Sequence, residues 1–235
     1  MCGRFTLYHT PDEVAERFAV GDLLETDARY NIAPTQNVAV VTQKGTEAQQ
    51  GTEFRNGARH LADYHWGLIP SWAKDASIGS RMINARAETL AEKPSFRTAL
   101  TRRRCLIPAD GFYEWQAAPD GAKGGKTPTY LHRKDSGLFA FAGLWDEWHA
   151  SDGSPLRSCT IITTTPNAVA ARIHDRMPVI LRPDDEALWL DPAVTDTRAL
   201  LPLLVPSPAE DMEAYPVSRR VNVPTVDEPE LIAAV

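Results

Sequence analysis

The apolar segments of this sequence are short, and that shortness restricts the fold more than any other feature. Each is rich in β-branched or aromatic residues and is bounded by turn residues, a pattern typical of β-strands. No regular alternation of strand and helix connects them, so they predict an α+β fold with a mostly antiparallel, barrel-like β-sheet core and flanking short helices. The predicted strands cover residues 38–41, 105–108, 111–115, 129–132, 138–144 and 159–164, and the alternation of Phe5 and Leu7 with polar neighbours predicts one more.

Short helices and two loop excursions separate these strands. Helices are predicted after the capping pattern of Thr10 and Glu13, at 85–103 with an interruption at Pro94, at 167–173 and at 184–190. Residues 42–62 indicate a hairpin excursion, and the glycine-rich stretch 117–127 indicates a loop. Because no internal repeat and no low-complexity linker divides the chain, we expect a single domain over residues 1–235.

The charge distribution is uneven along the chain. A net charge of −6 argues against a nucleic-acid partner, but residues 183–235 hold eleven acidic and three basic residues, so the rest of the chain is slightly basic. Residues 81–104 alone carry seven basic residues against two acidic ones. A local basic face could bind phosphates while the acidic segment, part of the domain or appended to it, keeps the chain in solution. On charge alone, a solvated arginine-rich helix explains the pattern better.

Other bulk features bear on the compartment. No stretch approaches the length of a membrane span, and the first ten residues lack the apolar run of a signal peptide. Cys2, Cys105 and Cys159 are odd in number and far apart, so they predict neither a disulfide framework nor a metal cluster. A reducing compartment, the cytoplasm, is the expectation, with no membrane partner and no metal or other cofactor.

Cys2 has the most distinctive chemistry. An initiator methionine is usually removed before a small residue, and removal here would leave an α-amine and a thiol on adjacent carbons. Their unperturbed pKa values, near ~7.7–8.0 and ~8.5, leave both groups partly nucleophilic at neutral pH. Such a 1,2-aminothiol converts an aldehyde to an imine and then to a thiazolidine ring. The same pair could also serve an N-terminal-nucleophile amidohydrolase or peptidase, or Cys2 could be incidental at a frayed terminus.

The residues after Cys2 argue against fraying. Gly3 permits a close backbone approach, and Arg4 places a permanent bidentate donor two residues from the nucleophile. Phe5 and Leu7 predict that the following strand is anchored in the core. A nucleophile on such a strand is held in position.

Asn84, Arg86 and Glu114 are further candidates. Asn84 offers both a donor and an acceptor, and Arg86 has a planar fork that matches a phosphate. A helix N-cap followed by a surface Arg–Glu pair would explain the same residues. Glu114 lies between aromatic residues, where burial would raise its carboxyl pKa toward neutrality and suit it to proton transfer. A glutamate on the wet face of the strand is the alternative.

His174 and Arg176 form the sharpest local cluster. His174 can protonate a leaving oxygen near pH 7, and Arg176 can hold a phosphate beside it, although a structural histidine is the common alternative. Trp66 and Trp72 are candidates for stacking on unpaired bases, which contributes about 1–3 kcal/mol per base. Both could instead be core residues. We expect Trp66 to be a core residue with partial exposure and Trp72 to be exposed.

Several longer stretches resemble the SOS-response-associated peptidase (SRAP) family, whose members shield abasic sites in single-stranded DNA. They occur in the same order almost to the end of the chain, as far as about residue 223, and eight motifs in one order are highly specific. The stretches are CGRF at 2–5, YNIAPTQ at 30–36, WGLIPSWAKD at 66–75, INARAETL at 83–90, SFRTAL at 95–100, RRCLIPADGFYEW at 103–115, FAGLWDEW at 141–148 and CTIITTTPNAVAARIHDRMPVIL at 159–181.

The resemblance implies a role for each candidate. Cys2 is similar to the crosslinking nucleophile, Asn84 to the residue that orients its amine, Glu114 to the acid/base and His174 to the residue that assists sugar ring opening. Residues similar to the DNA contacts are Arg4, Asn31, Trp66, Trp72, Arg86 and Arg176. The implied partner is single-stranded DNA with abasic sites, bound by a monomer.

The chain also departs from the family pattern. The insert at 42–62 and the loop at 117–127 could alter what flanks the site, and Thr129 separates Pro128 from the aromatic Tyr130. Two other function classes stay open: a peptidase or amidase that uses Cys2, and a non-covalent single-stranded DNA binder in which Cys2 is incidental.

Overall fold

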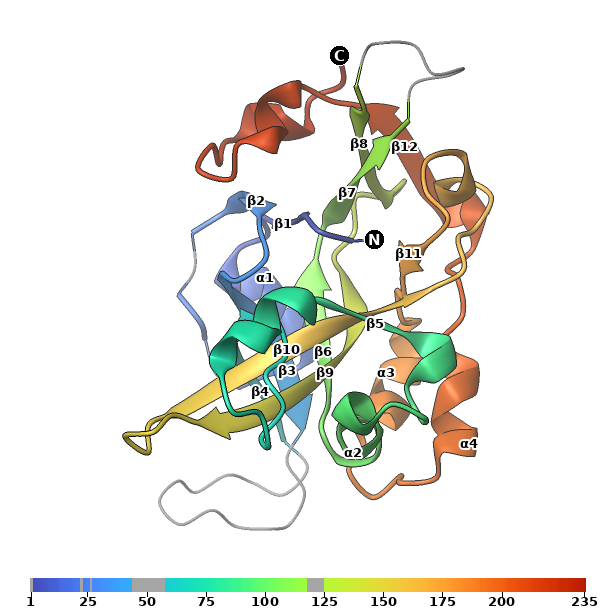
Figure 1. Cartoon of the computed structure of the whole chain (residues 1–235). Helices are drawn as coiled ribbons and strands as arrows, with labels where there is room; N and C mark the ends of the chain where they lie inside the picture. Colours follow the sequence, from blue (N-terminus) through green and yellow to red (C-terminus); the bar gives the residue numbers. More distant parts are fainter. Residues whose placement is uncertain (1, 22, 26, 44–57, 118–124) are drawn as a thin grey trace.

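Two β-sheets organise the computed structural model, which describes residues 2–21, 23–25, 27–43, 58–117 and 125–235 (Figure 1). Five strands of the first sheet form a closed ring: β3 (Asn37–Gln43), β4 (Arg59–Trp66), β6 (Arg104–Ala109), β9 (Phe139–His149) and β10 (Pro155–Thr164). The ring runs β10–β4–β3–β6–β9 and closes where β9 pairs with β10. Only the β10–β4 contact in this ring is parallel, so the first sheet is a mostly antiparallel barrel.

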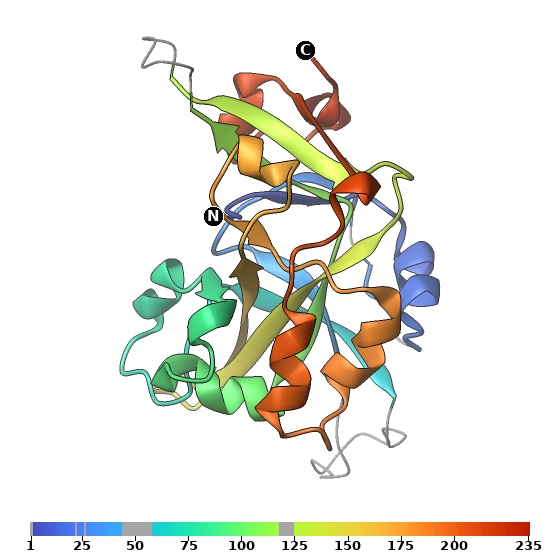
Figure 2. The same cartoon turned by 90° about the vertical axis from the view of Figure 1, so that its right-hand side faces the viewer.

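The second sheet is antiparallel and lies beside the barrel (Figures 1 and 2). Its order is β12 (Met212–Pro216), β8 (Thr127–Arg133), β7 (Gly111–Gln116), β1 (Phe5–Leu7) and β2 (Arg29–Ile32). Two short strands, β5 (Asn84–Arg86) and β11 (Met177–Pro178), add to β10. β1 and β5 therefore bring the start of the chain and residues 84–86 toward the region where the two sheets meet.

Aromatic packing joins the two sheets through one hydrophobic core. The Phe5 ring lies 5.1 Å from the Trp66 ring and 5.7 Å from the Phe141 ring, both edge to face. Phe112 of β7 also packs on Phe141, at 6.1 Å. Such pairs contribute about 0.5–1.5 kcal/mol each beyond their buried area. They hold β1, which begins three residues after Cys2, against the barrel.

The α-helices are short: α1 (Pro11–Phe18), α2 (Pro94–Arg102), α3 (Pro183–Leu190) and α4 (Thr197–Leu200). α1 begins with a capping box, in which Thr10 accepts from the Glu13 amide and Glu13 accepts from the Thr10 amide. α2, α3 and α4 gather at the lower end of the barrel (Figure 2). Single 3₁₀ turns complete the fold: η1 (Ala76–Arg81), η2 (Ala87–Thr89), η4 (Ala170–Arg172), η5 (Leu201–Leu203), η6 (Ala209–Asp211), η7 (Arg219–Asn222) and η8 (Pro229–Ile232).

The predicted fold class is confirmed, and each predicted strand corresponds to an observed one. The helix predicted at 85–103 is wrong in its first half, because residues 84–86 pair with β10 and the helix begins only at Pro94, whose ring cannot continue a preceding helix. The segment 167–173 contains one 3₁₀ turn where a helix was predicted. The hairpin predicted at 42–62 is present at its base, where Gln43 pairs with Arg59, and residues 44–57 lie outside the described residues.

The structure adds elements that the sequence analysis missed. Strands β2, β4 and β12 were not predicted, and the acidic segment 183–235 supplies Leu190, Leu200, Leu204 and Met212 to the main core. The predicted loop at 117–127 lies mostly outside the described residues. Within the described part of the chain, every helix is too short or too polar to cross a membrane.

Candidate functional site

Cys2 and Asn84 meet where the second sheet approaches β5. Cys2 immediately precedes the Gly3–Arg4 segment that leads into β1, and its side chain is fully buried. Asn84 opens β5, which is held against Ile161 of β10 by parallel pairing. The Asn84 Nδ2 donates to the Cys2 carbonyl oxygen at 2.7 Å, so the side chain of Asn84 fixes the backbone of the nucleophile. The other Asn84 atom, Oδ1, is buried and accepts no hydrogen bond from the described residues.

The environment of the Cys2 thiol keeps it protonated. Burial raises the pKa of this thiol far above its ordinary value, and the negative charge of the nearby Glu114 carboxylate raises it further. The positive charge of the N-terminal amine and, after it, the backbone N–H of Arg4 act in the opposite direction but do not cancel the rise. A thiol in such a place is a poor nucleophile until a neighbouring base removes its proton.

Glu114 carries a carboxyl group suited to act as this base. It lies on β7, buried on the same face as Phe112, two residues earlier in the strand. Burial raises the pKa of the Glu114 carboxyl above its ordinary value, and the N-terminal amine, and after it His174 and Lys126 when they are positively charged, oppose that shift. The carboxyl therefore changes protonation state closer to neutral pH than an exposed glutamate does, as a proton-transfer group should.

His174 follows η4 and lies near enough to Glu114 for its charge to act on the Glu114 pKa. Its Nδ1 accepts from the Arg176 backbone N–H at 3.1 Å, which assigns the proton of the neutral ring to Nε2. Asp175 Oδ1 lies 2.8 Å from the same Nδ1, but an unprotonated nitrogen gains nothing from a carboxylate and the Asp175 side chain is 86% exposed. We therefore take the backbone bond as the one that orients the ring, with Nε2–H as the donor.

The other two cysteines have no part in this arrangement. Cys105 on β6 and Cys159 on β10 are buried in the barrel, and both are free thiols. Burial raises their pKa values well above the ordinary range, so both are unreactive. Among the residues that the structure describes, no group of three or more His, Cys, Asp or Glu side chains could hold a metal ion.

A family model described as SOS response associated peptidase (SRAP) matches residues 1–224 of the chain. The chain belongs to the SRAP family. It is 48% identical to the abasic site processing protein YoqW of Bacillus subtilis, over 99% of both chains. It is 34% identical to the abasic site processing protein HMCES of Gallus gallus, over 88% of this chain and 66% of that protein. A crystal structure of a protein from Bacteroides thetaiotaomicron superposes with a TM-score of 0.84 and 26% identity, over the whole of both chains.

Two arginines of this SRAP chain flank the four central residues. Arg86, the last residue of β5, is exposed. The Arg176 guanidinium makes a two-bond ion pair with Glu88, at 2.6 and 2.9 Å, and also donates to the Thr163 carbonyl oxygen at 2.7 Å. The Arg176 bonds lower the pKa of Glu88. A phosphate at Arg176 would have to compete with the Glu88 carboxylate, whereas Arg86 is accessible.

Arg4 and Asn31 have a structural part that the sequence analysis did not foresee. Both are buried, and the Arg4 guanidinium donates to Asn31 Oδ1 at 2.6 Å and to the Val221 carbonyl oxygen at 2.7 Å. Asn31 Nδ2 donates to the carbonyl oxygens of Val223 and Val226, at 3.0 and 2.6 Å. These bonds fasten the C-terminal segment of the SRAP fold to β1 and β2, directly beside Cys2. Contact of Arg4 and Asn31 with DNA stays a prediction.

The two tryptophans differ sharply. Trp66 is fully buried, and its indole N–H donates to the Ile83 carbonyl oxygen at 3.0 Å. The expected core position of Trp66 is confirmed, and its expected partial exposure is wrong, because this internal acceptor and the edge contact with Phe5 bury the whole ring. A base could not stack on it in this conformation. Trp72 is 61% exposed, as expected.

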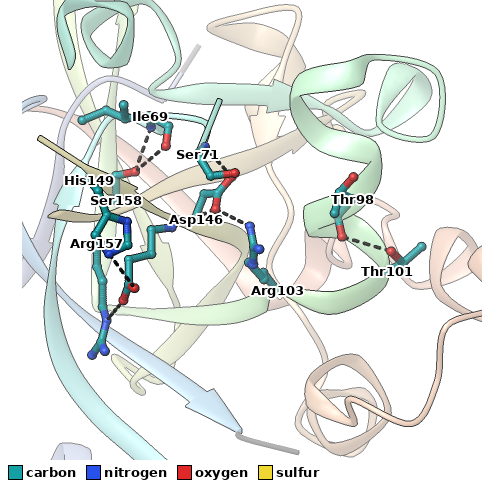
Figure 3. Close-up of polar contacts among 10 residues, drawn as sticks. Ile69, Ser71, Thr98, Thr101, Arg103, Asp146, His149, Arg157 and Ser158 are labelled. Atoms are coloured by element: carbon teal, nitrogen blue, oxygen red, sulfur yellow. Dashed lines mark hydrogen bonds and ion pairs between the residues drawn. The ribbon is translucent and has the colours of Figure 1, made fainter. Parts of the chain in front are cut away.

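The turn that carries Trp72 is fixed from both sides. The Ser71 N–H donates to Asp146 at 3.0 Å, and Asp146 is also bound by Arg103 (Figure 3). On the other side of Trp72, the Ala73 carbonyl oxygen accepts from the Trp148 indole at 2.7 Å. Trp72 borders an open cavity of about 460 Å³, which it shares with α2. Asp146 and Trp148 belong to the FAGLWDEW stretch, so a match of that motif was the signal for these supporting residues.

Proposed function

We propose that this protein, once Met1 has been removed, forms a covalent crosslink between Cys2 and the ring-opened aldehyde of an abasic site in single-stranded DNA. The observation that carries the proposal is the Asn84 bond that holds the Cys2 backbone beside Glu114, 2.7 Å from Nδ2 to the carbonyl oxygen. The names of the relatives, abasic site processing proteins, support the same substrate. The crosslink shields the lesion during the response to DNA damage.

The chemistry proceeds in two bond-forming steps. The Cys2 amine adds to C1′ of the aldehyde, and one water leaves as the imine forms. The sulfur then adds to the imine carbon, its proton passes to the nitrogen, and a five-membered thiazolidine ring closes. The overall reaction joins one aldehyde and one aminothiol with loss of one water. Holding the three groups together supplies effective concentration worth on the order of 7–11 kcal/mol in favourable cases.

The proton movements give roles to Glu114 and His174. Because burial raises the pKa of the Cys2 thiol, the sulfur needs a base as it attacks, and the Glu114 carboxylate is near enough for its charge to act on that pKa. Glu114 accepts the thiol proton and delivers it to the imine nitrogen. His174, with its proton on Nε2, donates to the sugar ring oxygen so that the closed sugar opens to the aldehyde.

DNA contacts outside the central site are made by two arginines and one tryptophan. Arg86 and Arg176 bind phosphates on either side of the abasic nucleotide, and Arg176 exchanges Glu88 for phosphate when it does so. Trp72, exposed on a turn that Asp146 and Trp148 fix, stacks on an unpaired base. Neither contact depends on the base sequence. A protein that recognises a lesion requires contacts of this kind.

Two measurements test the proposal. Intact-mass analysis of the purified protein should show that Met1 is absent. An oligonucleotide with one abasic site should then give a band that survives denaturing electrophoresis in high salt. Cys2→Ala should abolish the band and Cys159→Ala, at an equally buried cysteine, should not. Retention of Met1, or an equally stable band with Cys2→Ser, would refute the thiazolidine.

A peptidase is the second candidate, because the family description itself names one. The same buried Cys2 beside Glu114 would act as an N-terminal nucleophile, with removal of Met1 as its first turnover. Hydrolysis of an unrelated peptide that depends on Cys2 would favour this function. A protein that binds abasic DNA equally well with Cys2→Ala, and never covalently, would instead be a non-covalent binder.

A further inference from the structure

The antiparallel pairing of β7 with β8 places Thr129 directly opposite Glu114. Residues paired in this way point to the same face of a sheet, with Cβ atoms about 4.5–5.5 Å apart. Their neighbours two positions away, Phe112 and Leu131, are also paired and both belong to the main core. Thr129 and Glu114 therefore share the inner face of the second sheet, and both are buried, at 3% and 4% exposure.

The Thr129 hydroxyl has no hydrogen-bond partner among the described residues. Burying a hydroxyl in this way is unfavourable, and buried polar groups without partners are rare in folded proteins. On its other side Thr129 is paired with Pro216 of β12, whose side chain offers no acceptor. The diagonal neighbour Gln116 uses its amide N–H to bind the Arg172 carbonyl oxygen. The carboxyl of Glu114 is the acceptor that the sheet places directly across from this hydroxyl.

Other ionisable groups also act on the pKa of Glu114, and the effect of Thr129 would add to theirs. The N-terminal amine and the Cys2 thiol interact with it from the N-terminal segment, His174 from the segment after η4, and Lys126 from just before β8. Each of these is a group that can itself titrate. A threonine hydroxyl differs because it stays neutral at every pH and can turn about one bond to donate to a carboxylate.

We propose that Thr129 is a positioning residue for Glu114, whose hydroxyl donates to the carboxylate whenever Glu114 is ionised. This inference rests on the proposed function only because Glu114 acts there as the base. When Glu114 is protonated, the hydroxyl has no charge to bind. When Glu114 releases its proton, a small side-chain rotation gives the buried negative charge a neutral donor that no other titration can remove. Thr129 thereby favours the base form of Glu114 and fixes which way it points.

The direct test needs no DNA. In protein labelled with ¹³C at glutamate side chains, the Glu114 carboxyl resonance is identified by its loss in Glu114→Gln and is titrated with pH. Thr129→Val removes the hydroxyl at nearly constant volume, and Thr129→Ser keeps it. The matched control is Thr160→Val on β10, a second buried threonine whose hydroxyl has no partner among the described residues and which is paired with Leu144.

We expect Thr129→Val to raise the Glu114 pKa by about one unit, the size expected for one hydrogen bond to a charged group. Thr129→Ser and Thr160→Val should leave it near the wild-type value. A Thr129→Val titration that overlays wild type overturns the proposal, as does an equal shift in Thr129→Ser or Thr160→Val. If Thr129→Val does not fold, Thr129→Ala removes the same hydroxyl and is judged in the same way.

Crosslinking to abasic DNA provides the second readout. The inflection in the rate–pH profile that Glu114→Gln removes should move to higher pH by about one unit in Thr129→Val, and stay in place in Thr129→Ser. Wild-type protein that forms no adduct would end the proposed function and leave the carboxyl titration to decide on Thr129. An adduct whose pH profile ignores Thr129, together with an unchanged titration, would end the inference alone.

Discussion

Asn31→Ala separates a structural part for Asn31 from a part in DNA contact. The substitution removes the Oδ1 acceptor of the buried Arg4 guanidinium, a charge-assisted bond of 2.6 Å. It also removes the Nδ2 donor of the Val223 and Val226 carbonyl oxygens. Hydrogen bonds to charged groups contribute about 1.5–3 kcal/mol and neutral ones about 0.5–1.5 kcal/mol.

The expected loss of stability is smaller than the sum of these hydrogen-bond free energies. Val223 is half-exposed, so its carbonyl oxygen can bind water once Asn31 is truncated. Arg4 keeps its bond to the Val221 carbonyl oxygen at 2.7 Å. We expect Asn31→Ala to lower the free energy of unfolding by about 3 kcal/mol, which is roughly 6–12 °C in melting temperature for a chain of this length. Urea unfolding followed by tryptophan fluorescence measures the loss.

Asn37→Ala is the matched control, because Asn37 is exposed on the neighbouring strand β3. It should change the free energy of unfolding by less than about 0.5 kcal/mol. Limited proteolysis should cut the segment after residue 217 faster in Asn31→Ala than in the control. If Asn31→Ala unfolds like wild type while its binding to DNA is weakened, the structural reasoning is refuted and Asn31 acts at the DNA.

Three further predictions concern the proposed site. Because burial raises the pKa of Glu114, the folded state binds the proton more tightly than the unfolded state, and stability is lost as pH rises above the ordinary value of 4.5. Glu114→Gln should therefore be more stable than wild type at pH 8 and equal to it at pH 4 in urea unfolding. Arg86→Gln should weaken binding of abasic oligonucleotide and reduce the slope of log affinity against log salt by about 0.7, and an unchanged slope would remove Arg86 from the phosphate contacts. Iodoacetamide should alkylate Cys2 far more slowly than a free cysteine at pH 7.5, since the thiol is buried with a raised pKa, and rapid labelling in the native protein would contradict the structure.

Local sequence patterns predicted the local structure well. Alternation and β-branched content located β3, β6, β7, β8, β9 and β10, and the Thr10–Glu13 signal located the start of α1. These patterns depend on neighbours within one turn or one strand. The closure of the barrel depends instead on β10 pairing with both β4 and β9, and β4 is parallel to it across nearly a hundred residues of chain. Periodicity indicates that a segment is a strand, but it does not indicate which other strand pairs with it.

The candidate site, too, could be predicted from the sequence only in part. Cys2, Asn84, Glu114 and His174 were named from motifs, and the Asn84–Cys2 bond and the charge interactions of Glu114 bring these residues into one neighbourhood. Burial could not be predicted residue by residue. Trp66 lies inside because Ile83 supplies an acceptor for its indole. Arg4 lies inside because Asn31 and the Val221 carbonyl oxygen satisfy its guanidinium, a combination that joins three distant parts of the chain.

The burial of Cys2 has a chemical consequence that the motif alone does not carry. An exposed aminothiol would react with any aldehyde or oxidant, because a fraction of its thiol is ionised at neutral pH. Here burial and the Glu114 carboxylate both suppress the thiolate, so the sulfur stays inert until a proton acceptor and an electrophile are present together. In the proposed reaction the imine supplies both, since its carbon takes the sulfur and its nitrogen takes the proton by way of Glu114. The same carboxylate that holds the resting thiol protonated is thus the base that allows it to react, which restricts the reaction to an aldehyde already bound to the amine.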